Sequence, residues 1–182
     1  MKREDVLSYL KKLDQNERKK LRNLGVRFGR YHIFLFKLFK PSTVSLRTLL
    51  WKNYHEKNEQ LEPPTFGLNF LEQDKPSNRE FMLLCGFEKF DRFYVRIDIL
   101  ERLFLMIFNS KNKNNDTEIK LIPDMLNLLG CNKENFIKLL NKMNYKTFEK
   151  EKDLYFKYLP SKKAFKRKNV IYRLFNWILL WF

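Results

Sequence analysis

Few residues in this sequence have the type and spacing that acid–base chemistry requires. His32 lies in an aromatic segment, and no acidic side chain stands near it in the sequence to orient its ring as a general base. We therefore expect His32 to be packed or partly exposed. Asp98 and Glu101 lie one helical turn apart, and such a pair is typical of a solvated helix face. The sequence accordingly predicts no catalytic residue.

The motifs that hold metals or nucleotides are also missing. The only cysteines are Cys85 and Cys131, and the only histidines are His32 and His55. Because no CxxC or HxxxH spacing occurs, we expect no structural zinc site, and we expect both thiols to be buried. No GxxxxGK[ST] loop and no GxSxG turn is present. These absences predict a chain without metal or cofactor that does not hydrolyse ATP by itself.

The charge of the chain is strongly positive and unevenly distributed. Its 182 residues carry a formal net charge of +16, well beyond that of an ordinary small domain. Residues 1–60 have a net charge of +9 and residues 161–182 of +6, whereas residues 61–110 have −2 and residues 111–160 have +3. Such an excess favours polyanions, either nucleic acid or an anionic membrane surface.

The densest group of basic residues alternates with aromatic residues near the N-terminus. Proteins bind single-stranded nucleic acid by placing cationic side chains against its phosphates and by stacking aromatic rings on its bases. The alternative is that the rings, which include Phe28, Phe34 and Phe36, form one face of a core strand. The candidate nucleic-acid-binding residues in this group are Arg22, Arg27, Arg30, Tyr31, Lys37 and Lys40.

A second candidate surface lies on the helix expected over residues 133–144. Asn135, Lys138 and Lys142 fall on the face opposite its apolar residues. In helix-turn-helix proteins such a face enters the major groove or lies along phosphates. The alternative is an ordinary solvated face.

Periodicity and turn residues predict an α-rich α+β fold. Asp14 and Glu17 have capping-box spacing, and Gly25 suits a helix C-terminus. Residues 26–38 are predicted to be one extended segment, of which residues 26–35 are the strandlike part. After residue 87 the expected order is strand, helix, short strand, helix, helix and hairpin, which is the order of a winged helix. The expected organisation is a basic helical region, a linker with a short helix, a winged-helix-like unit and a basic then apolar tail, over residues 1–60, 61–86, 87–160 and 161–182.

The two ends of the chain bear on its location. No apolar signal segment follows Met1, so we expect a reducing cytoplasm. In the tail, residues 170–182 are interrupted by Arg173 and Asn176. As a helix they would be about 20 Å long, against a hydrocarbon core of about 30 Å. A membrane partner is therefore not expected, although this tail supports the alternative of a membrane-associated basic protein.

Three stretches resemble the C-terminal region of bacterial superfamily 2 helicases, the alphaproteobacterial relatives of the mitochondrial RNA-degradosome helicase. They are LRNLGVRFGRYHIFLFKLFKPSTVSLRTLLW (21–51), YVRIDILERL (94–103) and IPDMLNLLGCNKENFIKLLNKMNYK (122–146). The third stretch has Pro123, Asp124, Met125, Gly130 and Cys131 in matching positions. The blocks occur in the order of that family and cover roughly residues 15–150.

The resemblance implies an accessory platform that holds RNA or DNA beside helicase motor lobes. The two RecA-like lobes of such helicases, with their nucleotide and magnesium sites, have no counterpart in this sequence. No catalytic residue is therefore carried over, and the motor lobes would be a separately encoded partner. We expect a non-catalytic nucleic-acid-binding module, present as a fragment, a split gene or a standalone protein. The alternative is a standalone winged-helix DNA-binding regulator.

Overall fold

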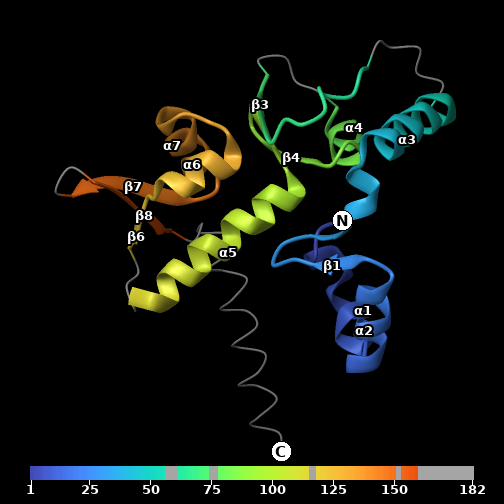
Figure 1. Ribbon diagram of the computed structural model, residues 1–182, viewed down its shortest axis with the longest axis horizontal. Helices are drawn as coiled ribbons and strands as arrows, with labels where there is room; N and C mark the ends of the chain where they lie inside the picture. Colours follow the sequence, from blue (N-terminus) through green and yellow to red (C-terminus); the bar gives the residue numbers. More distant parts are fainter. Residues whose placement is uncertain (56–60, 74–77, 115–117, 151–152, 160–182) are drawn as a thin grey trace, which may run out of the picture.

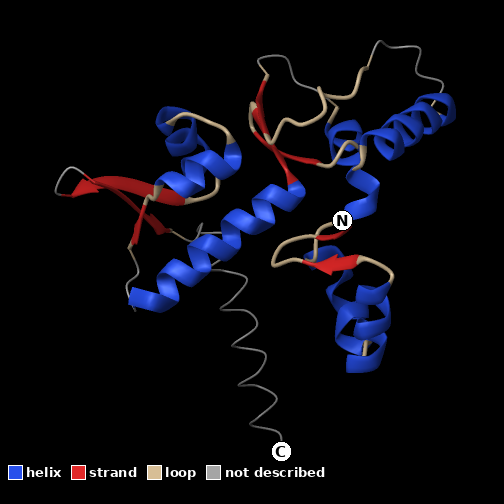
Figure 2. Cartoon of the chain, viewed as in Figure 1, coloured by secondary structure: helices blue, strands red, loops and turns tan. Residues whose placement is uncertain are grey.

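The structure is a computed structural model, and it describes residues 1–55, 61–73, 78–114, 118–150 and 153–159. Helices and short antiparallel strands are mixed along the chain, as Figure 2 shows, which confirms the α+β class. Within these ranges the strands form three small sheets, with the orders β1-β2, β3-β5-β4 and β6-β8-β7. The expected tail at 161–182 lies outside the described residues.

Local capping rules explain the N-terminal helices. A 3₁₀ turn, Glu4–Val6, leads into α1, Leu7–Lys12, and α2 follows over Gln15–Asn23. Asp14 accepts from the backbone N–H of Glu17 at 2.6 Å, while the Glu17 carboxylate accepts from the N–H of Asp14 at 2.9 Å. This is the predicted capping box.

The extended segment predicted at 26–35 is wrong, because these residues form a hairpin. β1, Val26–Phe28, pairs antiparallel with β2, Ile33–Leu35, and the chain reverses over residues 29–32. The reversal is held by hydrogen bonds to Glu101, which lies about 70 positions further along the chain. Periodicity within residues 26–35 carries no information about such a distant contact. A 3₁₀ turn, Phe36–Phe39, then leads into α3, Pro41–Tyr54, whose first residue is a proline, the residue that suits the first turn of a helix.

The middle of the chain contains the predicted short helix and one strand that was not predicted. The helix is α4, Arg79–Leu84, which Asn78 caps, and the strand is β3, Phe70–Glu72. β3 pairs with β5, Phe93–Arg96, which also pairs with β4, Phe87–Phe90. This sheet joins residues 61–73 to the segment that follows residue 87.

The long helix α5, Ile97–Asn114, is the element around which the rest is arranged. In Figure 1 the C-terminal elements lie on one side of α5, β1 with α1 and α2 lies on the other side, and α3 and α4 lie beyond its N-terminal end. The C-terminal elements are β6, α6, α7, β7 and β8, over Ile119–Lys120, Pro123–Leu129, Lys133–Lys142, Tyr145–Lys150 and Asp153–Tyr158. The polar residues at 111–114 belong to α5, which continues to Asn114.

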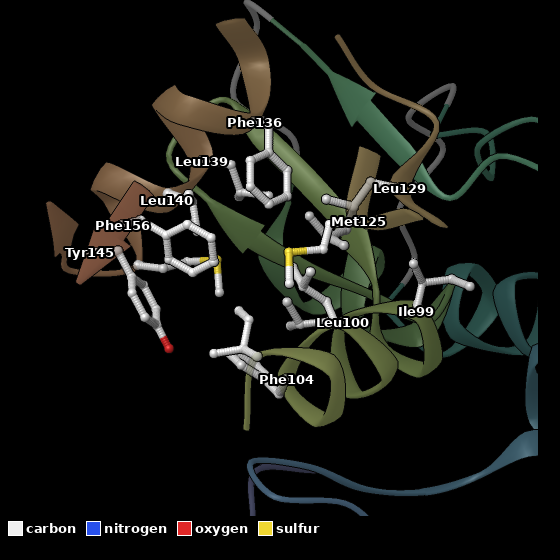
Figure 3. Packing of buried hydrophobic residues seen from close by; sticks show 14 of the residues in the cluster. Ile99, Leu100, Phe104, Met125, Leu129, Phe136, Leu139, Leu140, Tyr145 and Phe156 are labelled. Carbon is white, nitrogen blue, oxygen red and sulfur yellow. The ribbon is translucent and has the colours of Figure 1, made fainter. Parts of the chain in front are cut away.

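Two apolar clusters form the core, and β5 contributes to both. Phe93 and Val95 pack into the larger cluster with α5, α6 and α7, whereas Tyr94 packs into the smaller one with α3 and α4. This division follows from the alternation of side chains along a strand. In the larger cluster, shown in Figure 3, Phe136 and Leu100 lie among the converging side chains, and both are fully buried.

Candidate nucleic-acid interface

A long acid-free stretch of sequence forms α2, the β1–β2 hairpin and α3. Residues 18–55 contain ten Lys and Arg side chains and no Asp or Glu. All five cationic candidates of this stretch expose their side chains, and none of them forms an ion pair with a described residue. They are Arg22, Arg27, Arg30, Lys37 and Lys40. Unpaired exposed cations of this kind remain available to phosphates.

Basic and aromatic side chains lie together on the β1–β2 hairpin. Arg27 lies directly across from Phe34, so these two side chains share one face. The guanidinium of Arg22 lies over the ring of Phe28 at 5.9 Å, and Phe28 and Phe34 are half-buried. Tyr31 is 43% exposed. The rings are thus divided, some packing in the protein and others open to a ligand.

The turn between β1 and β2 is held by the carboxylate of Glu101 on α5. This carboxylate accepts backbone N–H bonds from Arg30 at 2.5 Å, from Tyr31 at 3.0 Å and from His32 at 2.7 Å. A Cβ atom at Gly29 would lie 2.5 Å from the same carboxyl group, so only glycine allows this approach. Glu101 therefore positions the two candidate residues, Arg30 and Tyr31.

His32 is buried between two carboxylates from different elements. Its Nδ1 lies 3.0 Å from Glu101 Oε1, and its Nε2 lies 3.2 Å from Glu88 Oε2 on β4. A carboxylate only accepts hydrogen bonds, so both ring nitrogens donate when the imidazole is doubly protonated. Arg79 Nη2 and Lys2 Nζ approach the other oxygen of Glu88 at 3.1 and 3.8 Å. Each of the two carboxylates in the cluster therefore has at least one cationic partner when His32 is charged.

Burial and hydrogen bonding act in opposite directions on the pKa values of this cluster. Burial lowers the pKa of His32, but hydrogen bonds to Glu101 and Glu88 outweigh it, and the pKa is raised above its ordinary 6.5. Burial would raise the pKa values of Glu88 and Glu101. Hydrogen bonds from His32, and for Glu101 from the backbone of the turn, nevertheless hold both below 4.5.

One interpretation of these residues is confirmed and one is corrected. His32 is packed, as expected, and the acids that orient its ring come from distant positions, Glu88 and Glu101. Asp98 and Glu101 are 5% and 6% exposed, so they do not form a solvated face. Arg96 neutralises Asp98 through two hydrogen bonds of 2.7 and 3.0 Å, and the turn at residues 29–32 covers Glu101. Neither nitrogen of His32 is open to a substrate, which favours a structural role.

The His32 cluster predicts that stability falls on both sides of an acidic optimum. The raised pKa of His32 means that its contribution is complete below 6.5 and is lost as the pH rises through its folded-state pKa. The pKa values of Glu88 and Glu101 are lowered, so the contribution of these carboxylates to stability is complete above pH 4.5. That contribution is lost as the pH falls through their folded-state pKa values. We expect the urea midpoint to be highest between pH 4.5 and 6.5.

The control for this prediction is His32→Gln, which cannot titrate in this range. The variant is expected to be less stable at pH 5.5 and to show little of the decline that the unaltered protein shows as the pH rises above neutrality. Equal slopes of midpoint against pH in the two proteins would mean that His32 is not charged in the fold.

The second candidate surface, on α7, is largely engaged by acids of the same chain. Asn135 Nδ2 donates to Glu72 on β3 at 3.0 Å, and Lys142 Nζ lies 2.6 Å from Asp91. Lys138 is exposed and forms no ion pair with a described residue. The structure therefore places the three residues on α7 as expected but leaves only Lys138 unengaged among the described residues.

The remaining chemistry-bearing residues are consistent with protein packing. Burial raises the pKa of the Cys85 thiol to about 12 and that of the Cys131 thiol to about 11. Cys85 is buried as expected, whereas Cys131 is half-buried.

The described residues contain no group of three or more His, Cys, Asp or Glu side chains that could hold a metal ion. Among the described helices, none combines the length and apolar character needed to cross a bilayer.

Comparisons with protein-family models, with curated proteins and with solved structures give no match to this chain. The interface is therefore interpreted from its own geometry. Sequence reasoning missed Glu88 and Glu101, because nothing local connects either of them to His32.

Proposed function

We propose that this chain is a non-catalytic nucleic-acid-binding module, part of or derived from a superfamily 2 helicase. The observation that carries the proposal is the set of exposed cations on residues 18–55, which have no ion-pair partner in the described structure. The resemblance to helicase C-terminal regions suggests the accessory role and a partner that carries the motor lobes. The ligand class is RNA or DNA, in single-stranded form, because exposed rings accompany the cations.

The element order from α5 to β8 supports a winged-helix-like unit within the module. A helix-turn-helix, α6 and α7, is followed by the β7–β8 hairpin, and β6 pairs with the far strand of that hairpin. In a sequence-specific regulator the outer face of α7 would be free to enter the major groove. Here Asn135 and Lys142 bond to acids of the same chain, which favours the accessory role over the regulator.

The experiment that tests the proposal is a titration of a single-stranded oligonucleotide at several salt concentrations. Each phosphate contact adds about 0.7 to the log–log salt slope for single strands, so four or five contacts predict a slope of about −3. Raising salt fourfold should then weaken binding about 60-fold. Replacing Arg27 and Arg30 by Ala should reduce the size of the slope by about 1.4, because two contacts are lost.

The matched control replaces Lys138 and Lys142 by Ala, which removes the same charge from α7. We expect a smaller effect from this pair, because Lys142 is already paired with Asp91. Absence of binding at low salt would remove nucleic acid as the ligand. A larger effect of the α7 pair would place the interface on α7 and favour the regulator.

A further inference from the structure

A cavity between the N-terminal segment and the C-terminal elements combines aromatic rings with cations. Its volume is about 460 Å³, within the range of small-molecule sites. Its lining comes from the first residues of the chain, the β1–β2 turn, α5 and the segment from the end of α7 into the β7–β8 hairpin. Segments far apart in the sequence therefore build it together.

The rings that line the cavity come from two parts of the fold. Tyr31 of the turn lies against Phe104 of α5, with ring centroids 4.2 Å apart. Tyr145 and Tyr158 are opposite one another in the β7–β8 hairpin, and their rings pack edge-to-face with centroids 5.3 Å apart. A neighbouring cavity of about 160 Å³ shares these four rings and Arg30. The rings thus offer π-faces, and Tyr31 and Tyr158 are 43% and 48% exposed.

The charged side chains around the cavity are mainly cationic. Lys2, Arg3, Arg30 and Lys142 line it, against the carboxylates of Glu4 and Glu88. Glu88 is compensated by His32, Arg79 and Lys2, and Lys142 is paired with Asp91. Among the described residues, Arg3 and Arg30 are therefore the lining cations that form no ion pair. The guanidinium of Arg30 lies over the rings of Phe108 at 4.9 Å and Tyr31 at 5.9 Å, beside both cavities. An anionic group next to an aromatic one matches this lining.

We infer that the cavity is a nucleotide site, in which a base stacks on the exposed rings of Tyr31 and Tyr158 and its phosphate lies against Arg30 and Arg3. The inference rests on the proposed function and specifies where one base of a bound strand is held. The same chemistry is present in a free nucleoside monophosphate, so both sources are tested.

The test uses the full chain and compares an oligonucleotide with an abasic strand of equal length, at low salt. Adenosine monophosphate and inorganic phosphate are titrated in parallel. The variants are Tyr31→Leu and Tyr158→Leu, with Tyr31→Phe to restore the ring. The control is Tyr155→Leu, because Tyr155 lies on the same strand as Tyr158 but stacks on Phe148 and lines neither cavity.

We expect the abasic strand to bind about tenfold more weakly than the oligonucleotide, since stacking one base contributes about 1–3 kcal/mol. Tyr31→Leu and Tyr158→Leu should each lower the affinity for the oligonucleotide about tenfold. Tyr31→Phe and Tyr155→Leu should leave this affinity unchanged. The free nucleotide is a ligand if the unaltered chain binds adenosine monophosphate but not inorganic phosphate, and if the two leucine variants no longer bind adenosine monophosphate. If only the oligonucleotide responds, the strand supplies the base.

The result that overturns the inference is normal oligonucleotide binding by both leucine variants, with folding verified by circular dichroism. In that case the exposed cations bind the strand and the cavity does not, so the proposed function is retained and the nucleotide site is rejected. If the unaltered chain binds no oligonucleotide and no nucleotide, the proposed function and the nucleotide site fail together.

Discussion

Replacing Glu101 by Ala is expected to lower the free energy of unfolding by about 3–5 kcal/mol, because it removes one partner of a buried ion pair. The carboxylate is 6% exposed and accepts from His32 Nδ1 and from three backbone N–H groups. Without it, a buried imidazolium loses one of its two anions and the turn loses its acceptor. Urea denaturation followed by circular dichroism at pH 6 measures the loss.

Glu118→Ala is the matched control, because Glu118 forms an ion pair with Lys150 at the surface. Exposed pairs contribute about 0–1 kcal/mol, so this variant should be nearly as stable as the unaltered protein. The Glu101 variant should also bind oligonucleotide more weakly under conditions where it remains folded, since Arg30 and Tyr31 lose their support. Equal stability of the two variants would show that Glu101 does not hold the turn.

Replacing Phe136 by Ala is expected to lower the free energy of unfolding by about 3–5 kcal/mol, because a fully buried ring is deleted. Phe136 lies edge-to-face with Phe156 of β8, with ring centroids 6.4 Å apart. The cavity left behind would separate α7 from the hairpin that carries Tyr145 and Tyr158. The urea midpoint should fall strongly, and the oligonucleotide affinity should fall with it as the C-terminal elements unfold.

Phe148→Ala tests whether the loss depends on burial or on the removal of an aromatic ring. Phe148 is half-buried on β7 and stacks on Tyr155, with centroids 6.2 Å apart. Such an aromatic pair is worth about 1 kcal/mol, so the expected loss is much smaller than that of Phe136→Ala. Similar losses in the two variants would contradict the position of Phe136 at the centre of the larger core cluster.

Features that depend on neighbours in the sequence were predictable. The capping box of Asp14 and Glu17 forms as expected, and the helix over Pro123–Leu129 ends at Gly130, whose φ is +70°. The Asn132 side chain caps α7 by accepting from the N–H of Asn135 at 2.8 Å. These contacts join residues three or four positions apart, so residue type and spacing are enough to specify them.

The candidate interface was predictable only in part, for the same reason. The density of cations and rings in residues 18–40 is a property of the sequence, and exposure of the five cationic candidates agrees with it. The engagement of Asn135 and Lys142 by Glu72 and Asp91 could not be anticipated, since neither acid lies near them along the chain.

What the sequence by itself determined is the local order of helices and turns, the α+β class and the positive charge of its N-terminal region. Only the tertiary structure decided that residues 26–35 fold back as a hairpin and that His32 lies between Glu88 and Glu101. The physical reason is that burial of a side chain depends on which distant segment covers it. His32 and Glu101 are 69 positions apart, and only packing of the turn on α5 makes one the partner of the other.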